Sequence, residues 1–279
     1  MASARAAQQL AGTAPTEAAW LFVEYAGAWG RKAVAESRLP DEVRSFLDGL
    51  DGVRVQLIRR HRGAEGPGTR IFSADLGAVA GPVVRAAVLE DVRDVVSLDR
   101  ETMEAYDDAL WLVCTNGRRD VCCAEAGRPI AGALAARWPE ATWETTHLGG
   151  HRFAGTLLAL PSGIALGRLS AESAVAACRE IAAGRVPVAS SRGRAGLSGA
   201  AQFAELHIRR ELGLSGLDEV VVTSVDGEEV GLHTPRGPVV VRVDSSPGEL
   251  ARQSCADLNT KSAPVYEVRS VPGRRRAPD

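Results

Sequence analysis

The chain has 279 residues, of which 45% are hydrophobic and 24% are charged, a composition typical of a globular protein with a substantial core. Its formal net charge is -2, so no strong positive field favours nucleic acid or an anionic membrane as a partner. No apolar run reaches the roughly 18 residues of a membrane helix, and residues 1–15 lack the apolar block of a secretory signal. We therefore expect a cytoplasmic protein with neither nucleic-acid nor membrane partners.

Length and composition also predict the domain organisation. At about 150 residues per domain, the chain is expected to contain roughly two domains. Residues 1–15 and 271–279 are small or polar and lack hydrophobic periodicity, which predicts a disordered tail at each end. Residues 16–105 and 106–185 are predicted to form two successive α/β units, and residues 186–270 a linker helix with a small β element.

The two units are predicted to have the same order of elements: strand, helix, three strands, helix. In the first unit, strands are expected at 19–25, 53–60, 69–76 and 82–89, and helices at 31–50, interrupted at Pro40, and at 90–98. In the second unit, strands are expected at 111–114, 141–147, 155–160 and 163–169, and helices at 128–138 and 170–184, with Pro129 and Ser170 at their starts.

The first strands of the two units are similar in sequence. Trp20-Leu21-Phe22-Val23 and Trp111-Leu112-Val113-Cys114 lie 91 residues apart. We infer two copies of one α/β unit, whose element order resembles the thioredoxin fold. Only the second copy has cysteines after its first strand, so we expect the chemistry there.

The C-terminal part is predicted to be a smaller α+β appendage. Residues 185–200 are rich in Gly, Ser and Arg, which predicts a linker. A helix is expected at about 199–212, followed by strands at 219–225, 238–244 and 264–270, with a turn at Asp226-Gly227.

Four potential metal ligands follow in the second unit. Cys114 and Cys123 have eight residues between them, and His147 and His151 have three. Two thiolates and two imidazoles form a complete tetrahedral set, as in structural zinc sites. Structural zinc sites usually use more closely spaced cysteines, however, so the spacing argues against Zn²⁺ without excluding it.

The residues between the two histidines favour a loop over a helix. Gly149 and Gly150 would each cost about 1 kcal/mol inside a helix, which argues against a metalloprotease helix with both imidazoles on one face. In a loop, these glycines let backbone N–H groups approach an anionic cofactor. A [2Fe–2S] cluster takes four protein ligands, and two of them can be histidines. The cluster therefore fits this segment better than Zn²⁺ does.

The segments Cys-x-x-Gly-x-Arg-Asp-x-Cys-Cys and His-x-Gly-Gly-His-Arg-Phe-Ala-Gly resemble those of the sucrase/ferredoxin-like family, iron–sulfur proteins built like thioredoxin-like ferredoxins. The resemblance implies a [2Fe–2S] cluster ligated by Cys114, Cys123, His147 and His151, with cysteines and histidines on separate irons. It also implies that residues 16–105 form an N-terminal thioredoxin-like lobe and that residues 106–185 form the ferredoxin lobe carrying the cluster. Further matching positions are Trp20, the Trp29-Gly30-Arg31 turn, Gln202, Glu205, Ser254-Cys255 and Tyr266.

This resemblance favours a carrier of single electrons over a catalyst. It does not name the electron donor or acceptor; we expect a redox protein as partner, for which a flavin-dependent reductase would be a natural choice. The resemblance does not imply a glycosidase, because glycoside hydrolysis needs a positioned carboxylate pair and the spacing singles out none. The alternatives are a structural zinc module and a thioredoxin-like thiol–disulfide redox protein that uses Cys122, Cys123 or Cys114.

Several neighbouring residues leave alternatives open. Cys122 competes with Cys123 for one ligand position, and the resemblance favours Cys123, because the family shares its eight-residue spacing from Cys114. Cys178 is expected to lie in the core. Three arginines near the ligands could offset cluster charge, dock an acidic partner or form an ordinary solvated surface: Arg118, Arg119 and Arg152.

Overall fold

The structure is a computed structural model that describes residues 8–63, 66–77, 81–252 and 259–270. The helices are α2 (Asp41–Asp48), α3 (Val121–Ala135), α4 (Ala171–Ala182) and α5 (Gly199–Leu212), with short 3₁₀ helices η1 (His61–Gly63), η2 (Val92–Val96), η3 (Arg100–Thr102) and η4 (His151–Phe153). The first ten strands are β1 (Ala19–Glu24), β2 (Val53–Arg59), β3 (Thr69–Asp75), β4 (Val83–Leu89), β5 (Glu104–Ala105), β6 (Leu110–Cys114), β7 (Thr142–Thr145), β8 (Leu157–Leu160), β9 (Ile164–Leu166) and β10 (Ser191–Arg194). The remaining strands are β11 (Val221–Asp226), β12 (Glu229–Thr234), β13 (Gly237–Pro247), β14 (Ala251–Arg252), β15 (Thr260–Lys261) and β16 (Pro264–Ser270).

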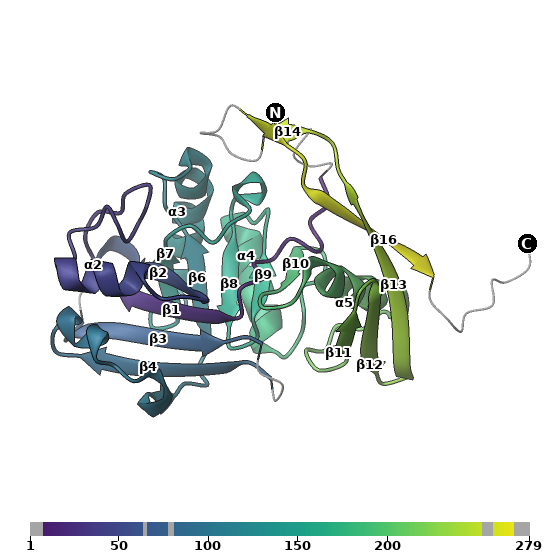
Figure 1. Ribbon diagram of the computed structural model, residues 1–279, viewed down its shortest axis with the longest axis horizontal. Helices are drawn as coiled ribbons and strands as arrows, with labels where there is room; N and C mark the ends of the chain where they lie inside the picture. The colour runs from purple at the N-terminus through teal and green to yellow at the C-terminus, as the bar shows by residue number, and fades with distance from the viewer. Residues whose placement is uncertain (1–7, 64–65, 78–80, 253–258, 271–279) are drawn as a thin grey trace, which may run out of the picture.

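One curled sheet of ten strands dominates the molecule (Figure 1), in the order β10-β9-β8-β6-β7-β2-β1-β3-β4-β5. β1 pairs in parallel with β2 and antiparallel with β3, which pairs with β4. β6 likewise pairs in parallel with β7 and antiparallel with β8, which pairs with β9. We call β1–β5 the first half of the sheet and β6–β10 the second half. The predicted mixed α/β class is confirmed.

The strands predicted between residues 19 and 169 are all present, because their β-branched and apolar side chains fill the core. Two helices of the first half are shorter than predicted. The helix expected over 31–50 is limited to α2, which has Pro40 as its N-cap, because the residue before a proline is disfavoured in the helical conformation. The helix expected over 90–98 is the 3₁₀ helix η2, capped by the Asp91 side chain.

Helix α3 begins seven residues before the predicted start at residue 128. Pro129 lies inside the helix and does not open it. A proline inside a helix removes the hydrogen bond to the carbonyl four residues earlier and crowds that carbonyl, yet α3 continues through Pro129. As a consequence, Cys122 and Cys123 lie in the first turn of α3.

Residues 8–15 differ from the predicted disordered tail. Leu10, Ala11 and Ala14 are buried, and the Gly12 N–H donates to the Arg192 carbonyl over 2.9 Å. These contacts use backbone groups and single small side chains, which produce no periodic pattern in the sequence. Residues 1–7, the predicted tail at 271–279 and Cys255 lie outside the described residues.

The region predicted as a linker contains β10, which pairs antiparallel with β9 and extends the large sheet. Helix α5 follows as predicted, with one side packed on the core of the large sheet and the other on a second sheet in the order β11-β12-β13-β16 (Figure 1). Three of these four strands were predicted, and β12 was not. No helix in the described part of the chain is long and apolar enough to cross a membrane.

A buried carboxylate joins the two halves of the large sheet where β2 meets β7. Glu144 is 4% exposed, and its Oε2 accepts hydrogen bonds from Arg59 Nη2 and from Thr115 Oγ1, each over 2.9 Å. Its Oε1 lies 2.9 Å from His61 Nδ1. Burial alone would raise the pKa of Glu144, but the bonds from His61, Arg59 and Thr115 outweigh burial and hold the pKa below its usual value.

Replacing this carboxylate tests whether it fastens the two halves together. At neutral pH, Glu144→Gln should lower the free energy of unfolding by about 1.5–3 kcal/mol, the value of a hydrogen bond to a charged group. Because the folded-state pKa is lowered, this contribution is present above the unfolded-state pKa and is lost on acidification. Wild type and variant should therefore converge in acid.

Urea denaturation at a series of pH values measures both effects. Glu140→Gln is the control, since that side chain is 88% exposed in its ion pair with Arg60 and such pairs contribute little. A Glu144→Gln protein as stable as wild type at neutral pH would contradict this account.

Candidate metal centre

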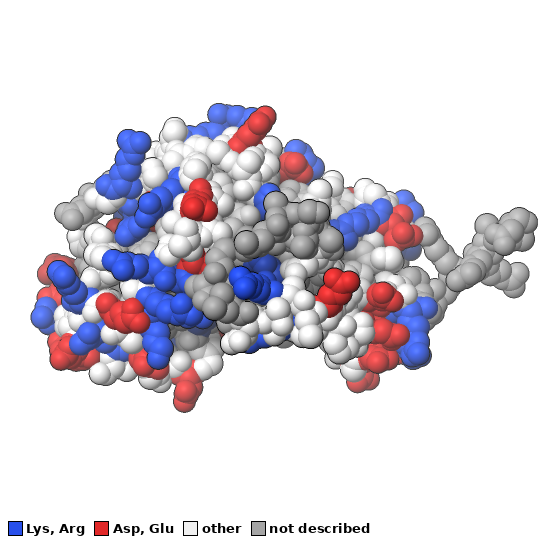
Figure 2. All heavy atoms as spheres, turned by 90° about the horizontal axis from the view of Figure 1, so that it is seen from above, with Lys and Arg blue, Asp and Glu red and all other residues white. Residues whose placement is uncertain are grey.

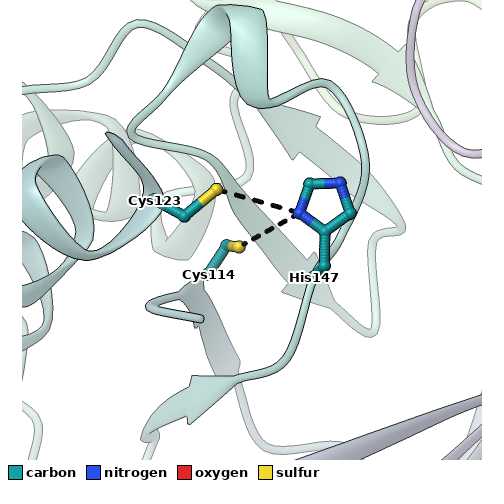
Figure 3. Close-up of side chains that lie close together, drawn as sticks. All are labelled: Cys114, Cys123 and His147. Carbon is teal, nitrogen blue, oxygen red and sulfur yellow. Dashed lines mark hydrogen bonds between the residues drawn. The ribbon is translucent and has the colours of Figure 1, made fainter. Parts of the chain in front are cut away.

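Three potential ligands converge from three elements of the second half (Figure 3). Cys114 ends β6, Cys123 lies in the first turn of α3, and His147 follows β7. His147 Nδ1 lies 3.9 Å from Cys114 Sγ and 3.8 Å from Cys123 Sγ, and the three donor atoms all lie within 4.8 Å of one another. Both cysteines are 1% exposed, whereas His147 is half-buried.

His151 joins this group through His147 and not through the sulfurs. His151 Nδ1 lies 2.9 Å from His147 Nε2, and the two rings stack with centroids 4.8 Å apart. The same nitrogen, His151 Nδ1, lies 3.3 Å from Asp120 Oδ2. Burial and the neighbouring His147 lower the pKa of His151 to about 4, so its ring is neutral at neutral pH. The neutral ring is the form that binds metal.

The two thiols of the group differ in acidity. The pKa of Cys114 lies well below its usual value, because Cys123 hydrogen-bonds to it and His147 lies beside it. The pKa of Cys123 is raised by the same contact and by Cys122. Neither cysteine forms a disulfide. Cys114 is therefore the more acidic of the two thiols, and a bound metal ion would deprotonate its ligand thiols.

The other cysteines of the second half lie outside the three-ligand group. Cys122 Sγ donates to the His151 carbonyl over 3.5 Å. Cys178 lies on α4 and faces the apolar core, where burial raises its pKa to about 12. The geometry thus favours Cys123 over Cys122, as the spacing does.

The first half of the sheet holds the backbone of His147 in place. Arg54 Nη2 and Gln56 Nε2, both on β2, donate to the His147 carbonyl over 3.0 and 3.4 Å. Thr146 Oγ1 donates to Gln56 Oε1 over 2.5 Å and accepts from the Leu57 N–H over 3.1 Å. These residues cannot be recognised from the sequence, because nothing local marks their contact with a segment about 90 residues away.

Arg192 supports the same loop from β10, in the region predicted as a linker. It is 2% exposed, and its guanidinium donates to the Gly149 carbonyl over 3.0 Å, to Thr13 Oγ1 over 3.2 Å and to the Thr13 carbonyl. Within the described ranges, no carboxylate forms an ion pair with it. Burial, together with Arg152 and Arg54, lowers the pKa of Arg192 to about 9. A buried cation of this kind favours a negative group nearby.

Gly150 makes room for this guanidinium. Its φ is +70°, in the left-handed region that favours glycine, and a Cβ there would collide with the Arg192 guanidinium. The Gly149-Gly150 pair therefore forms a tight turn over Arg192. This agrees with the loop that the sequence predicts between the two histidines.

A model of the sucrase/ferredoxin-like family matches residues 10–193, well over half of the chain. The chain belongs to the sucrase/ferredoxin-like family. The matched part covers the large sheet, the four predicted ligands and Arg192, and it leaves α5 and the second sheet outside. No curated protein and no solved structure matches the chain.

If Cys114, Cys123 and His147 form a metal-binding group, metal-free protein should bind Co²⁺ and show thiolate-to-cobalt charge-transfer absorption. Cys114→Ser and Cys123→Ser should each weaken Co²⁺ binding by more than the roughly 100-fold that loss of an outer partner costs. Cys178→Ser is the control and should bind like wild type. Equal affinities in all four proteins, measured by titration, would show that this group does not hold metal.

Proposed function

We propose that this protein carries single electrons on a [2Fe–2S] cluster ligated by Cys114, Cys123, His147 and His151. The observation that carries the proposal is the convergence of two buried thiols and an imidazole, with His147 Nδ1 3.9 and 3.8 Å from the sulfurs and His151 in contact with His147. Membership of the sucrase/ferredoxin-like family supports it. The matching strand orders of the two halves support two thioredoxin-like lobes.

The donor set and the charge around it fit such a cluster. Two thiolates and two neutral imidazoles are an established ligand set for [2Fe–2S]. With these ligands, a zinc site has no net charge, whereas a [2Fe–2S] cluster reduced by one electron has a net charge of -1. The buried Arg192 cation beside the Gly149 carbonyl is therefore better explained by the cluster than by Zn²⁺.

When bound, the cluster supplies reversible one-electron transfer. The protein's own residues hold and shield it. Cys114 and Cys123 lie on the buried side, and His147 and His151 form the half-exposed side. Asp120, with its Oδ2 3.3 Å from His151 Nδ1, orients that ring as an outer carboxylate does. Arg54 and Gln56 fix the backbone of His147.

The proposed setting is the cytoplasm, where a reducing environment keeps the cysteines available for iron. The proposed partner is a redox protein such as a flavin-dependent reductase.

Freshly purified protein should be brown and contain two irons and two sulfides per chain. Cys114→Ala and Cys123→Ala should lose most of this iron, because each removes a ligand, whereas Cys122→Ala should retain it. Visible absorption and iron and sulfide analysis measure this. A colourless protein with one zinc per chain would support the structural zinc module, and a colourless metal-free protein with reactive thiols would support the thiol–disulfide alternative.

Histidine ligation should set the reduction potential. The His147→Cys, His151→Cys double variant should keep a [2Fe–2S] cluster but lower its potential by an amount on the order of a few hundred mV, because two added thiolates oppose reduction. Electrochemistry on both proteins measures the difference, with Cys178→Ser as the matched control. A potential that stays the same or rises would show that these histidines are not ligands.

A further inference from the structure

Two hollows are both lined in part by the loop that joins β6 to α3. The larger, of about 670 Å³, has one acidic and three basic lining residues: Glu125, Arg59, Arg118 and Arg128. The smaller, of about 460 Å³, also has one acidic and three basic lining residues: Asp48, Arg31, Lys32 and Arg119. Asn116 lines both hollows, so they are neighbours, and His147 lines the smaller one.

Three of these six basic side chains are available for an external partner. Arg31, Lys32 and Arg118 are exposed, and within the described part of the chain none of them forms an ion pair. In Figure 2, a group of Lys and Arg side chains lies left of the centre of the face, and Asp and Glu side chains border it on the left as well as at the right-hand end. Because the whole chain has a net charge of -2, this is a local concentration of positive charge.

An apolar contact point lies among these charges. Val121, at the start of α3, is 60% exposed and lines the larger hollow. Protein interfaces commonly combine an apolar centre with a polar rim. The charges also extend over two hollows, which suits a macromolecule better than a single small anion.

We propose that the two hollows and the loop that lines both, here called the basic docking surface, bind an acidic redox protein that exchanges electrons with this chain. The proposal rests on the proposed function and specifies its partner. In the exchange, one electron leaves the reduced cluster and reduces the partner's one-electron centre, and no bond forms or breaks. His147 lies at the point of exit, because it both contacts the buried sulfurs and lines the smaller hollow.

The test is the rate at which two small oxidants of opposite charge reoxidise the reduced protein. Ferricyanide is an anion and tris(phenanthroline)cobalt(III) is a cation, and each accepts one electron. Stopped-flow absorption follows both reactions as salt is raised. The ferricyanide rate should fall by about tenfold, since salt screens an attraction, and the cobalt rate should rise.

A charge-reversal variant with a matched control identifies the surface responsible. Lys32→Glu with Arg118→Glu changes one exposed residue in each hollow. In this variant, added salt should raise the ferricyanide rate and lower the cobalt rate, the reverse of wild type. Arg137→Glu with Arg179→Glu makes the same change in net charge outside both hollows and should behave like wild type. A changed reduction potential would change the rates with both oxidants in the same direction, so it cannot produce this reversal.

Poly-L-glutamate tests for a macromolecular partner. At low salt it should slow the ferricyanide reaction of wild type by several-fold and leave that of the Lys32→Glu, Arg118→Glu variant unchanged. If ferricyanide is attracted but poly-L-glutamate has no effect, the surface binds small anions only and the proposed partner class is wrong. If the cluster is present and both oxidants respond alike to salt, the docking surface is wrong. If no cluster is present, the proposed function itself fails.

Discussion

The candidate centre depends on the antiparallel pairing of β2 with β7, which joins the two halves of the large sheet at Ile58–Thr145 and Arg59–Glu144. Two residue pairs are a short ladder, and the buried Glu144 carboxylate reinforces it with bonds from both halves. One of those bonds comes from Thr115, the residue next to Cys114. The same pairing brings β2 beside the residues that follow β7. The first half, which carries no ligand, thereby fixes the position of His147.

Arg192 places a second constraint on the same loop. A guanidinium that is 2% exposed must satisfy its donors within the protein, and it does so with Thr13 and the Gly149 carbonyl. These acceptors satisfy its hydrogen bonds but do not cancel its charge. An anionic centre would do so, and in turn the arginine would stabilise negative charge there. One buried positive charge, that of Arg192, therefore lies where the N-terminal segment, β10 and the His147–His151 loop meet, and an anionic centre would balance it.

Sequence patterns predicted the strands well, because each apolar run in the large sheet fills a buried core. They predicted poorly where backbone hydrogen bonds determine structure without an apolar pattern. Residues 191–194 read Ser-Arg-Gly-Arg yet form β10, and residues 8–15 are held by Arg192 and Gln202. The four candidate ligands were identified from residue type and spacing. Their supports Arg54, Gln56 and Glu144 were not, because those contacts span 85 to 93 positions.

The arrangement also explains what histidine contributes that cysteine would not. Cys114 and Cys123 are almost fully covered, and a third or fourth cysteine with its short side chain would leave the centre enclosed by protein. The imidazole of His147 has Nδ1 facing the sulfurs and its other edge facing His151 and the smaller hollow. It therefore links the buried sulfurs to the smaller hollow. In the proposed carrier, this longer ring lets the protein protect the sulfurs from water while keeping the centre within reach of a partner.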